Sequence, residues 1–248
     1  MTIQLAWDPG PQVPRDVWLA FGDSMTDGRG DIAEAPAGYV PNDGTLWMCK
    51  TAAAGQVQLA EPCGQAANAN AGVGPWGMFG WLVAQETGRE TLVINTGVGG
   101  STSSQWVPGQ ANYANALGRL QRVMSRREMT LRGFLIYMGP NDAVSATPSW
   151  RANVVSSLAG FRAWAGKTPA ECPAIISRLT AHVPTDVAYP GWAHVQAEIV
   201  AIEDADHLVI TPPSPADREA YNLHHKTGQN YTIAQSALTA AMSHASWG

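Results

Sequence analysis

The stretch VWLAFGDSMTDG, residues 17–28, decides the fold class. Its first five residues form a continuous apolar run, which is typical of a parallel strand that helices cover on both faces. A glycine ends this run, and polar residues follow it. The same arrangement, a short apolar run that leads into a turn, recurs at residues 92–94, 133–138, 174–179 and 208–210.

Segments with a helical spacing of apolar residues separate these runs. They cover residues 76–87, 113–124, 150–164, 192–202 and 227–242. The alternation predicts a doubly wound, three-layer α/β/α fold with a mainly parallel five-stranded sheet. Residues 25–75 are rich in Gly, Ala, Pro and Asn without a sustained period. We expect an irregular insertion there, within a single domain over residues 1–248.

The composition excludes several classes of protein. The chain has 248 residues, 45% of them hydrophobic, which allows a sizeable core and argues against disorder. No run approaches about 20 apolar residues, so no membrane-spanning helix is expected. The net charge of −5 argues against a nucleic-acid binder, which normally carries a basic surface. The first residues lack the pattern of a secretory signal, and the compartment stays open.

Three cysteines make neither a disulfide framework nor a zinc site. Cys49 and Cys63 flank one loop-like segment and could pair, whereas three unpaired thiols, with Cys172 as the third, are the simpler interpretation. We therefore expect no metal site.

The residues that follow the strands are the candidates for chemistry, because ligands of such sheets bind beyond the carboxyl ends of the strands. Ser24 follows the first strand on a tight turn, where its hydroxyl can face a cleft and its N–H can hold a developing oxyanion. Asp23 and Ser24 are equally the usual residue types for capping a helix. From this segment alone, both interpretations stand.

Three further candidates come from later segments. Gly99 and Gly100 follow the second strand, where glycines allow backbone N–H groups to approach a ligand closely. Asn141 follows the third strand and carries a neutral side-chain donor for an oxyanion. His224 precedes the last predicted helix and could serve as the general base for Ser24.

Together these segments resemble the SGNH hydrolases, also called GDSL esterases. The order of Ser24, Gly100, Asn141 and His224 along the chain matches the order of that family's four blocks. The resemblance is closer to the branch with carbohydrate O-acetylesterases of the sialate and acetylxylan type. The features that match that branch are Gly28-Arg29-Gly30, the run from Gly99 to Trp106 with one residue fewer than usual, and Asp142-Ala143.

This resemblance implies the flavodoxin-like arrangement of the family and a serine esterase without a cofactor. Ser24 would be the nucleophile and His224 the base. The oxyanion hole would consist of the N–H of Ser24, the N–H of Gly100 and the side chain of Asn141. The expected partner is an acetylated sugar or polysaccharide, with no nucleic acid and no membrane, and assembly into an oligomer is left open.

The last block departs from the family pattern, in which an Asp three residues before the His orients the imidazole. Tyr221 stands there for His224, and a phenol with a pKa near 10 cannot act as a carboxylate at neutral pH. For His225 the equivalent residue is Asn222. The preferred base is His224, with Asp217 or Glu219, a backbone carbonyl, or no group as its partner. Of these possibilities, only Asp217 and Glu219 would supply a carboxylate as the third member of a triad.

Candidates for substrate binding lie near the same edge. Trp47, Trp76 and Trp106 lie in or beside its loops, where flat aromatic faces could stack on sugar rings. Trp106 is preferred because the family motif carries a Trp near this place, and Asp23 is assigned to substrate binding as well.

Two other functions remain open. The same site could act on a lipid or thioester acyl chain, although the polar, glycine-rich insertion argues mildly against a long acyl pocket. Alternatively, the chain could be a carbohydrate-binding, virion or cell-surface structural module with a decayed site. The missing Asp favours that alternative, and retention of all four block residues opposes it.

Overall fold

The computed structural model describes most of the chain. The described residues are 15–28, 31–37, 39, 46–48, 57–58, 73–125, 128–145, 148–180, 188–211 and 227–247. The side chains of residue 32 and of strand residues 46–48 and 57–58 are outside this description.

These residues form a seven-stranded sheet with the order β3-β2-β4-β1-β5-β6-β7. Its strands are β1 (Arg15–Gly22), β2 (Leu46–Met48), β3 (Val57–Gln58), β4 (Glu90–Asn95), β5 (Met129–Tyr137), β6 (Ala174–Ser177) and β7 (His207–Ile210). Neighbouring strands are parallel, except that β2 and β3 are antiparallel. The predicted fold class and its five parallel strands, which are β1, β4, β5, β6 and β7, are confirmed.

Two short strands lie in the segment for which an irregular insertion was expected. β2 pairs with the edge of β4, and β3 pairs with β2 over only two residues. Runs of three and two residues are too short to show a period of their own, so their pairing with β4 is what makes them strands.

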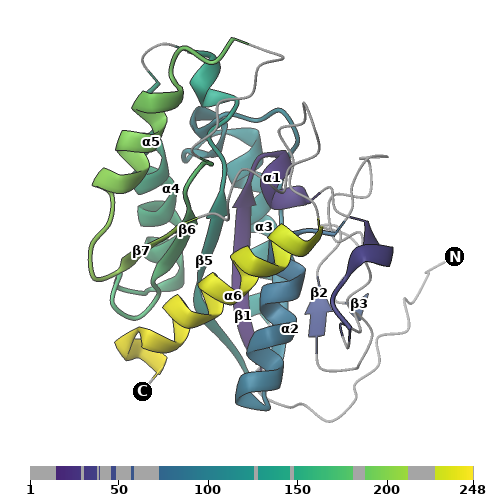
Figure 1. Cartoon of the computed structure of the whole chain (residues 1–248). Coiled ribbons are helices and arrows are strands. Elements are labelled where there is room, and N and C mark those ends of the chain that lie inside the picture. Colours follow the sequence, from purple (N-terminus) through teal and green to yellow (C-terminus); the bar gives the residue numbers. More distant parts are fainter. Residues whose placement is uncertain are drawn as a thin grey trace, which may run out of the picture.

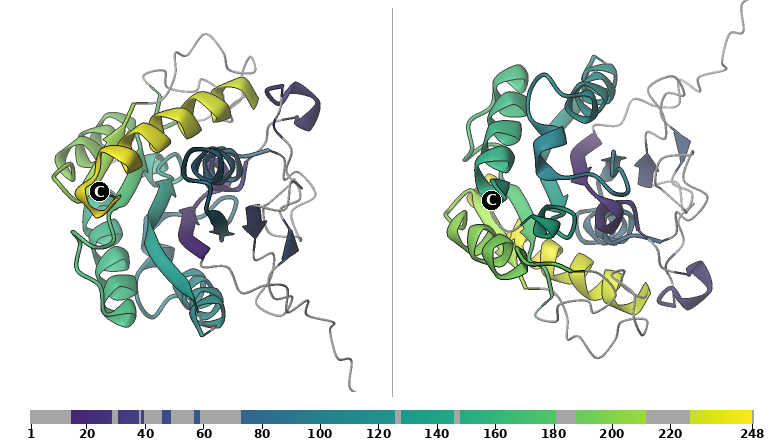
Figure 2. Two further views of the ribbon diagram at one scale, coloured as in Figure 1. Left: turned by 90° about the horizontal axis from the view of Figure 1, so that it is seen from below. Right: turned by 90° about the horizontal axis from the view of Figure 1, so that it is seen from above.

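Helices cover both faces of the sheet (Figures 1 and 2). They are α1 (Ser24–Asp27), α2 (Pro75–Thr87), α3 (Ala111–Met124), α4 (Trp150–Ala165), α5 (Trp192–Ala201) and α6 (Thr227–Ser243). Short 3-10 turns are η1 (Ile32–Glu34), η2 (Ser103–Trp106), η3 (Asp142–Val144) and η5 (Ala245–Trp247). Helices α2 and α6 pack together on one face, and α3 and α4 lie on the other with α5 beside α4. None of the described helices is long and apolar enough to span a membrane.

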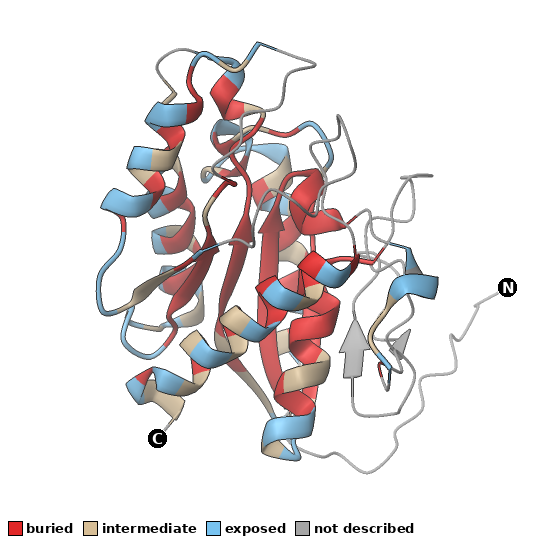
Figure 3. Ribbon diagram, in the orientation of Figure 1, coloured by how far each residue is buried: buried red, intermediate tan, exposed pale blue. Residues whose placement is uncertain are grey.

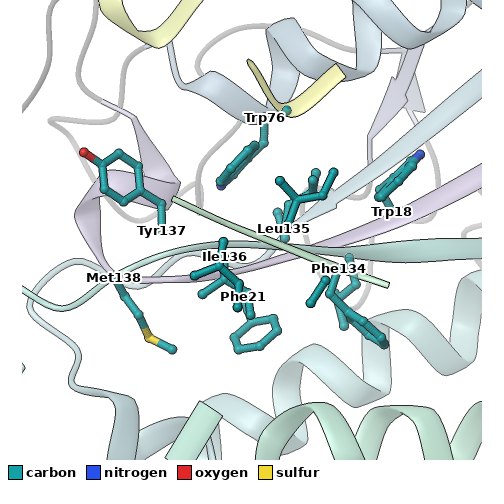
Figure 4. Close-up of a cluster of buried hydrophobic side chains, with 14 of the residues drawn as sticks. Trp18, Phe21, Trp76, Phe134, Leu135, Ile136, Tyr137 and Met138 are labelled. Carbon is teal, nitrogen blue, oxygen red and sulfur yellow. The ribbon is translucent and has the colours of Figure 1, made fainter. Parts of the chain in front are cut away.

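The core consists of two layers of side chains that point to opposite faces of the central strands, which are buried except toward their amino ends (Figures 3 and 4). On the face of α2, the Trp18 ring meets Phe79 edge-on at 4.9 Å between ring centroids. On the face of α4, Phe21 and Phe134 lie 5.4 and 5.9 Å from Phe161. This alternation fixes the strand register, because a slip by one residue would exchange the two layers.

The register also aligns the ends of the strands. Ala20 of β1 lies beside Asn95 of β4, and Gly22 lies beside Tyr137 of β5. The loops after β1, β4 and β5 therefore leave the sheet at the same edge. In the sheet, β4 lies on one side of β1, and β5, the next strand along the chain, lies on the other side. The strand order changes direction at this point, and ligands of doubly wound sheets bind at such a switch point.

The cysteine and metal expectations are tested only in part. Cys172 is a buried free thiol, and burial raises its pKa to about 12. Cys49 and Cys63 lie outside the described residues. Within the described ranges, no group of three or more His, Cys, Asp or Glu side chains is arranged to hold a metal ion.

Candidate active site

Helix α1 begins directly after β1, at Ser24. Asp23 is its N-cap, and one carboxylate oxygen of Asp23, Oδ1, accepts a hydrogen bond of 2.9 Å from the N–H of Met25. Ser24 is thus the first helical residue, and capping is the role of the Asp23 side chain. Ser24 is 6% exposed, and the amino end of α1 lies at the carboxyl edge of the sheet.

A close approach of backbone to backbone shapes the turn before Ser24. Gly22 has φ +148°, and a Cβ there would lie 2.6 Å from the carbonyl oxygen of Tyr137. Thr26 fastens the other side of the turn to β5, because its hydroxyl donates to the Tyr137 carbonyl at 2.8 Å and accepts from the Tyr137 N–H at 3.2 Å. Only glycine fits the first position, and the turn is held rigidly against β5.

The segment after β4 is attached to the same turn. The N–H of Val98 donates to the Gly22 carbonyl at 2.9 Å, and the hydroxyl of Ser101 donates to the same oxygen at 3.3 Å. Between these two anchors lies the exposed Gly100, whose φ of +78° is in the left-handed region that favours glycine.

Asn95, at the end of β4, contributes to this arrangement from within the core. Its side-chain amide donates to the Thr26 carbonyl at 3.1 Å and accepts from the N–H of Gly97 at 3.1 Å. This contact was not predicted. The only signal for it in the sequence is a polar residue at the end of an apolar run.

The segment after β5 meets the turn through Asp23. The second carboxylate oxygen, Oδ2, accepts from the N–H of Gly139 at 3.2 Å and from Nδ2 of Asn141 at 3.4 Å. Asp23 is fully buried, and burial raises its pKa from 3.8 to about 7 against the opposing effect of its N–H partners. Asn141 itself is only half-buried.

A second buried carboxylate joins the segment after β4 to the segment after β5. Asp142 accepts from the N–H of Ser103 at 3.0 Å and from the Ser103 hydroxyl at 2.5 Å. Asn153 of α4 donates to that hydroxyl at 3.0 Å. Burial raises the pKa of Asp142. The sequence analysis did not find this link, because its partners are 39 residues apart and only the fold brings them together.

The structure thus brings three of the four predicted segments together. The turn after β4 that carries Gly100 binds the Gly22 carbonyl, and Asn141 binds Asp23, so both segments are attached to the two residues that precede Ser24. The members of the fourth segment, His224, Asp217, Glu219, Tyr221, Asn222 and His225, lie outside the described residues. Helix α6 begins three residues after His224, and its first residue, Thr227, donates to the carbonyl of Asp31 at 2.6 Å.

Comparison with known families agrees with this geometry. The family model described as "Carbohydrate esterase, sialic acid-specific acetylesterase" matches residues 14–243, nearly the whole chain. The chain belongs to this carbohydrate esterase family. It is therefore a carboxylic ester hydrolase whose substrate class is carbohydrate. The search of curated proteins found no match.

Solved structures show the same fold as this carbohydrate esterase. A protein from Arabidopsis thaliana is 17% identical with a TM-score of 0.76, and the match covers 93% of this chain and 98% of that one. NanS is 11% identical with a TM-score of 0.67, over 93% and 98% of the two chains. A carbohydrate acetylesterase from Xanthomonas citri, XAC1771, is 17% identical with a TM-score of 0.59, over 93% of this chain but 56% of that one.

The assignment of Trp106 to substrate binding in this esterase is wrong. The side chain is fully buried, its Nε1 donates to the Ser101 hydroxyl at 3.1 Å, and its ring lies 5.6 Å from that of Phe21. A ring that is packed in the core has no face for a sugar. Trp76 is buried in the same way, and the side chain of Trp47 lies outside the described residues.

The assignment of Asp23 to substrate binding is also wrong, for a different reason. Its carboxylate is fully buried, and both oxygens already accept N–H groups of Met25, Gly139 and Asn141. Asp23 therefore holds the backbone and side-chain N–H groups around it in place, and its buried carboxylate is not accessible to a substrate.

Proposed function

We propose that this carbohydrate esterase removes O-acetyl groups from a sugar through an acyl-enzyme on Ser24. The observation that carries the proposal is the convergence of the turn with Gly100 and the segment with Asn141 on the two residues before Ser24. These contacts attach both segments to the residues next to Ser24, which supports their proposed role as neutral N–H donors in the attack of its hydroxyl on an ester carbonyl.

In the first half of the reaction, His224 accepts the proton of the Ser24 hydroxyl while Oγ bonds to the carbonyl carbon of the ester. The negative charge on the carbonyl oxygen is held by the N–H of Ser24, the N–H of Gly100 and Nδ2 of Asn141. The bond to the sugar oxygen then breaks, and that oxygen takes the proton from His224. The acetyl group remains on Ser24.

In the second half, water attacks the acetyl carbonyl and gives a proton to His224. The same three donors hold the second oxyanion. As the bond to Oγ breaks, Ser24 recovers its proton from His224 and acetate leaves. Tyr221 cannot serve as a carboxylate, so the candidates for the group that orients His224 are Asp217, Glu219 and a backbone carbonyl, and with none of them the site acts as a Ser24–His224 dyad.

Two contacts of α6 support the assignment of His224. Its first turn is fastened to the loops around α1, through Thr227 on Asp31 and through Asn230, whose amide donates to the Val73 carbonyl at 2.9 Å. The amino end of this helix, just after His224 in the chain, is thus held at the edge where Ser24 lies.

The test compares the hydrolysis of an aryl acetate and of an O-acetylated sugar by the wild type and Ser24→Ala. Ser156→Ala, which changes an exposed serine of α4, is the matched control. We expect the wild type and the control to be active and Ser24→Ala to be inactive. In the wild type, a fluorophosphonate probe should label Ser24 alone. Equal rates in all three proteins would remove Ser24 from the mechanism.

A series of aryl esters with longer acyl chains separates the acetylesterase from the lipid or thioester alternative. An acetylesterase loses kcat/KM as the chain grows from acetyl to octanoyl. A rise along the same series would instead support a long acyl pocket.

A further inference from the structure

The Asp23 carboxylate connects two segments of the proposed oxyanion hole. Oδ1 accepts from the N–H of Met25 in α1, and Oδ2 accepts from the N–H of Gly139 and from Nδ2 of Asn141. The carboxylate is fully buried, immediately before Ser24 in the chain and beneath the half-buried Asn141. A group in this position acts on the substrate only through its neighbours.

We propose that Asp23 is a positioning residue that turns the Asn141 amide so that one N–H is held by the carboxylate and the other faces the ester oxygen. The inference rests on the proposed acyl transfer at Ser24. It adds the group that determines how Asn141 is presented to the substrate.

The chemistry of the two side chains supports this assignment. An amide carries a donor group and an acceptor group of nearly the same shape, and rotation by half a turn exchanges them. Above its pKa of about 7 the Asp23 carboxylate only accepts hydrogen bonds, so it selects the orientation that presents Nδ2 and disfavours the one that presents the amide oxygen. Nδ2 carries two N–H groups, and the second is left to donate on the exposed side of Asn141.

The same carboxylate also sets the position of Ser24. Through the cap on Met25 it fixes where α1 begins, and hence where the N–H of its first residue points. One side chain therefore relates two of the three proposed oxyanion donors to each other. A shift of Asp23 would move both at once.

Asparagine cannot replace Asp23 in this role. Its amide oxygen could accept from Met25, but its NH₂ group would then face the N–H of Gly139 and Nδ2 of Asn141, donor against donor. In the opposite orientation it would bind Asn141 and lose the cap. Serine retains the cap and is too short to reach across to Asn141.

The test is a double-mutant cycle with Asp23→Asn, Asn141→Ala and the double variant, with aryl acetate as substrate at pH 8, where Asp23 is ionised. We expect Asp23→Asn to lower kcat by about 10- to 100-fold with little change in KM, which is less than the loss of a whole donor. In the background of Asn141→Ala, the same substitution should lower kcat by less than about threefold, because the group through which it acts is gone. An equal loss in both backgrounds, or no loss in either, would overturn the proposal.

Two controls separate positioning from general damage. Asp16→Asn changes the buried aspartate at the opposite, amino end of β1. It should leave kcat unchanged, with circular dichroism showing that the variant is folded. Asp23→Ser keeps the helix cap but should lose as much kcat as Asp23→Asn. Full kcat in Asp23→Ser would contradict the proposal. This second variant tests the proposal even if Asp23→Asn does not fold. If Ser24→Ala retains wild-type activity, the proposed function fails independently of these results.

Discussion

A buried aspartate lies at the amino end of β1 and another directly after its carboxyl end, and their surroundings are opposite in kind. At the amino end, Asp16 is paired with two guanidinium groups, Nη2 of Arg89 at 2.9 Å and Nε of Arg132 at 2.7 Å. At the carboxyl end, Asp23 accepts hydrogen bonds from the N–H donors of Met25, Gly139 and Asn141, and no cation of the described chain is paired with it. Both side chains are fully buried.

This difference separates a structural end of the molecule from a reactive one. Arg132, which binds Asp16, also lies 5.3 Å from the ring of Trp247, and that ring stacks on Trp18 at 5.8 Å. Charge and packing there support each other. At Asp23, burial raises the pKa of the carboxyl to about 7. Departures from ordinary stability rules of this kind are typical of functional sites.

The largest effect on stability is expected at the amino end. Asp16→Ala removes a buried carboxylate that accepts two charge-assisted hydrogen bonds, and it should lower the free energy of unfolding by about 3 kcal/mol, because the exposed Arg89 can be hydrated once its partner is lost. Urea denaturation measures this change, and kcat of the folded variant should match that of the wild type. A loss of kcat with unchanged stability would reverse the roles assigned to the two ends.

The next largest expected effect is a change in the free energy of unfolding with pH, which comes from the protonation of Asp23. Its pKa is raised from 3.8 unfolded to about 7 folded, so between these values the folded protein binds a proton that the unfolded chain has released. The contribution of Asp23 to stability is therefore largest below about pH 4, falls as the pH rises through this window, and is constant above about pH 7.

This dependence can be measured against Asp23→Asn, which has no group to titrate. Urea denaturation at several pH values between 4 and 8 should show the stability of the wild type falling relative to the variant as the pH rises toward 7. A difference that stays constant over this range contradicts the account of Asp23 as a carboxyl whose pKa is raised by burial.

The effect of Asn141→Ala should appear in catalysis and hardly in stability. Loss of one oxyanion donor typically lowers kcat by about 10²–10³-fold, and Asn141 is only half-buried. Gln121→Ala, which removes an exposed amide near the carboxyl end of helix α3, serves as the matched control. If kcat stays within twofold of the wild type, Asn141 is not a donor to the oxyanion.

A smaller effect on stability is expected at the carboxyl edge of the sheet, where Ser103 binds Asp142 and Asn153. Ser103→Ala removes the hydroxyl between Asp142 and Asn153 while the backbone N–H of residue 103 remains, and should lower the unfolding free energy by about 1–3 kcal/mol. The exposed neighbour Ser104 is the control, since Ser104→Ala should change stability by less than about 0.5 kcal/mol. Equal melting curves for the two variants would show that this network is not stabilising.

Much of the fold could be predicted because its signals are local. The apolar runs before Gly22, Gly97 and Gly139 locate the three central strands, and the polar residues after them locate the edge where the site forms. The strands β2 and β3 could not be predicted, because the edge of β4 and not their own sequence determines them.

The site could be predicted only to the level of segments. Position in a loop did not reveal that Trp106 turns inward onto Phe21, or that Asp23 is enclosed by N–H groups and does not face a substrate. The bond from Ser103 to Asp142 joins residues that no sequence pattern relates. Side-chain direction in irregular segments depends on tertiary contacts, and these become visible only in three dimensions.

The most direct test of the central claim is to trap the acyl-enzyme. The wild type is mixed with an aryl acetate, quenched in acid within the first turnover, digested and examined by mass spectrometry. The account predicts one acetyl group on Ser24 and none in Ser24→Ala, which should release no acetate. Release of acetate by Ser24→Ala at the wild-type rate, with no acetyl group on Ser24 of the wild type, would contradict it.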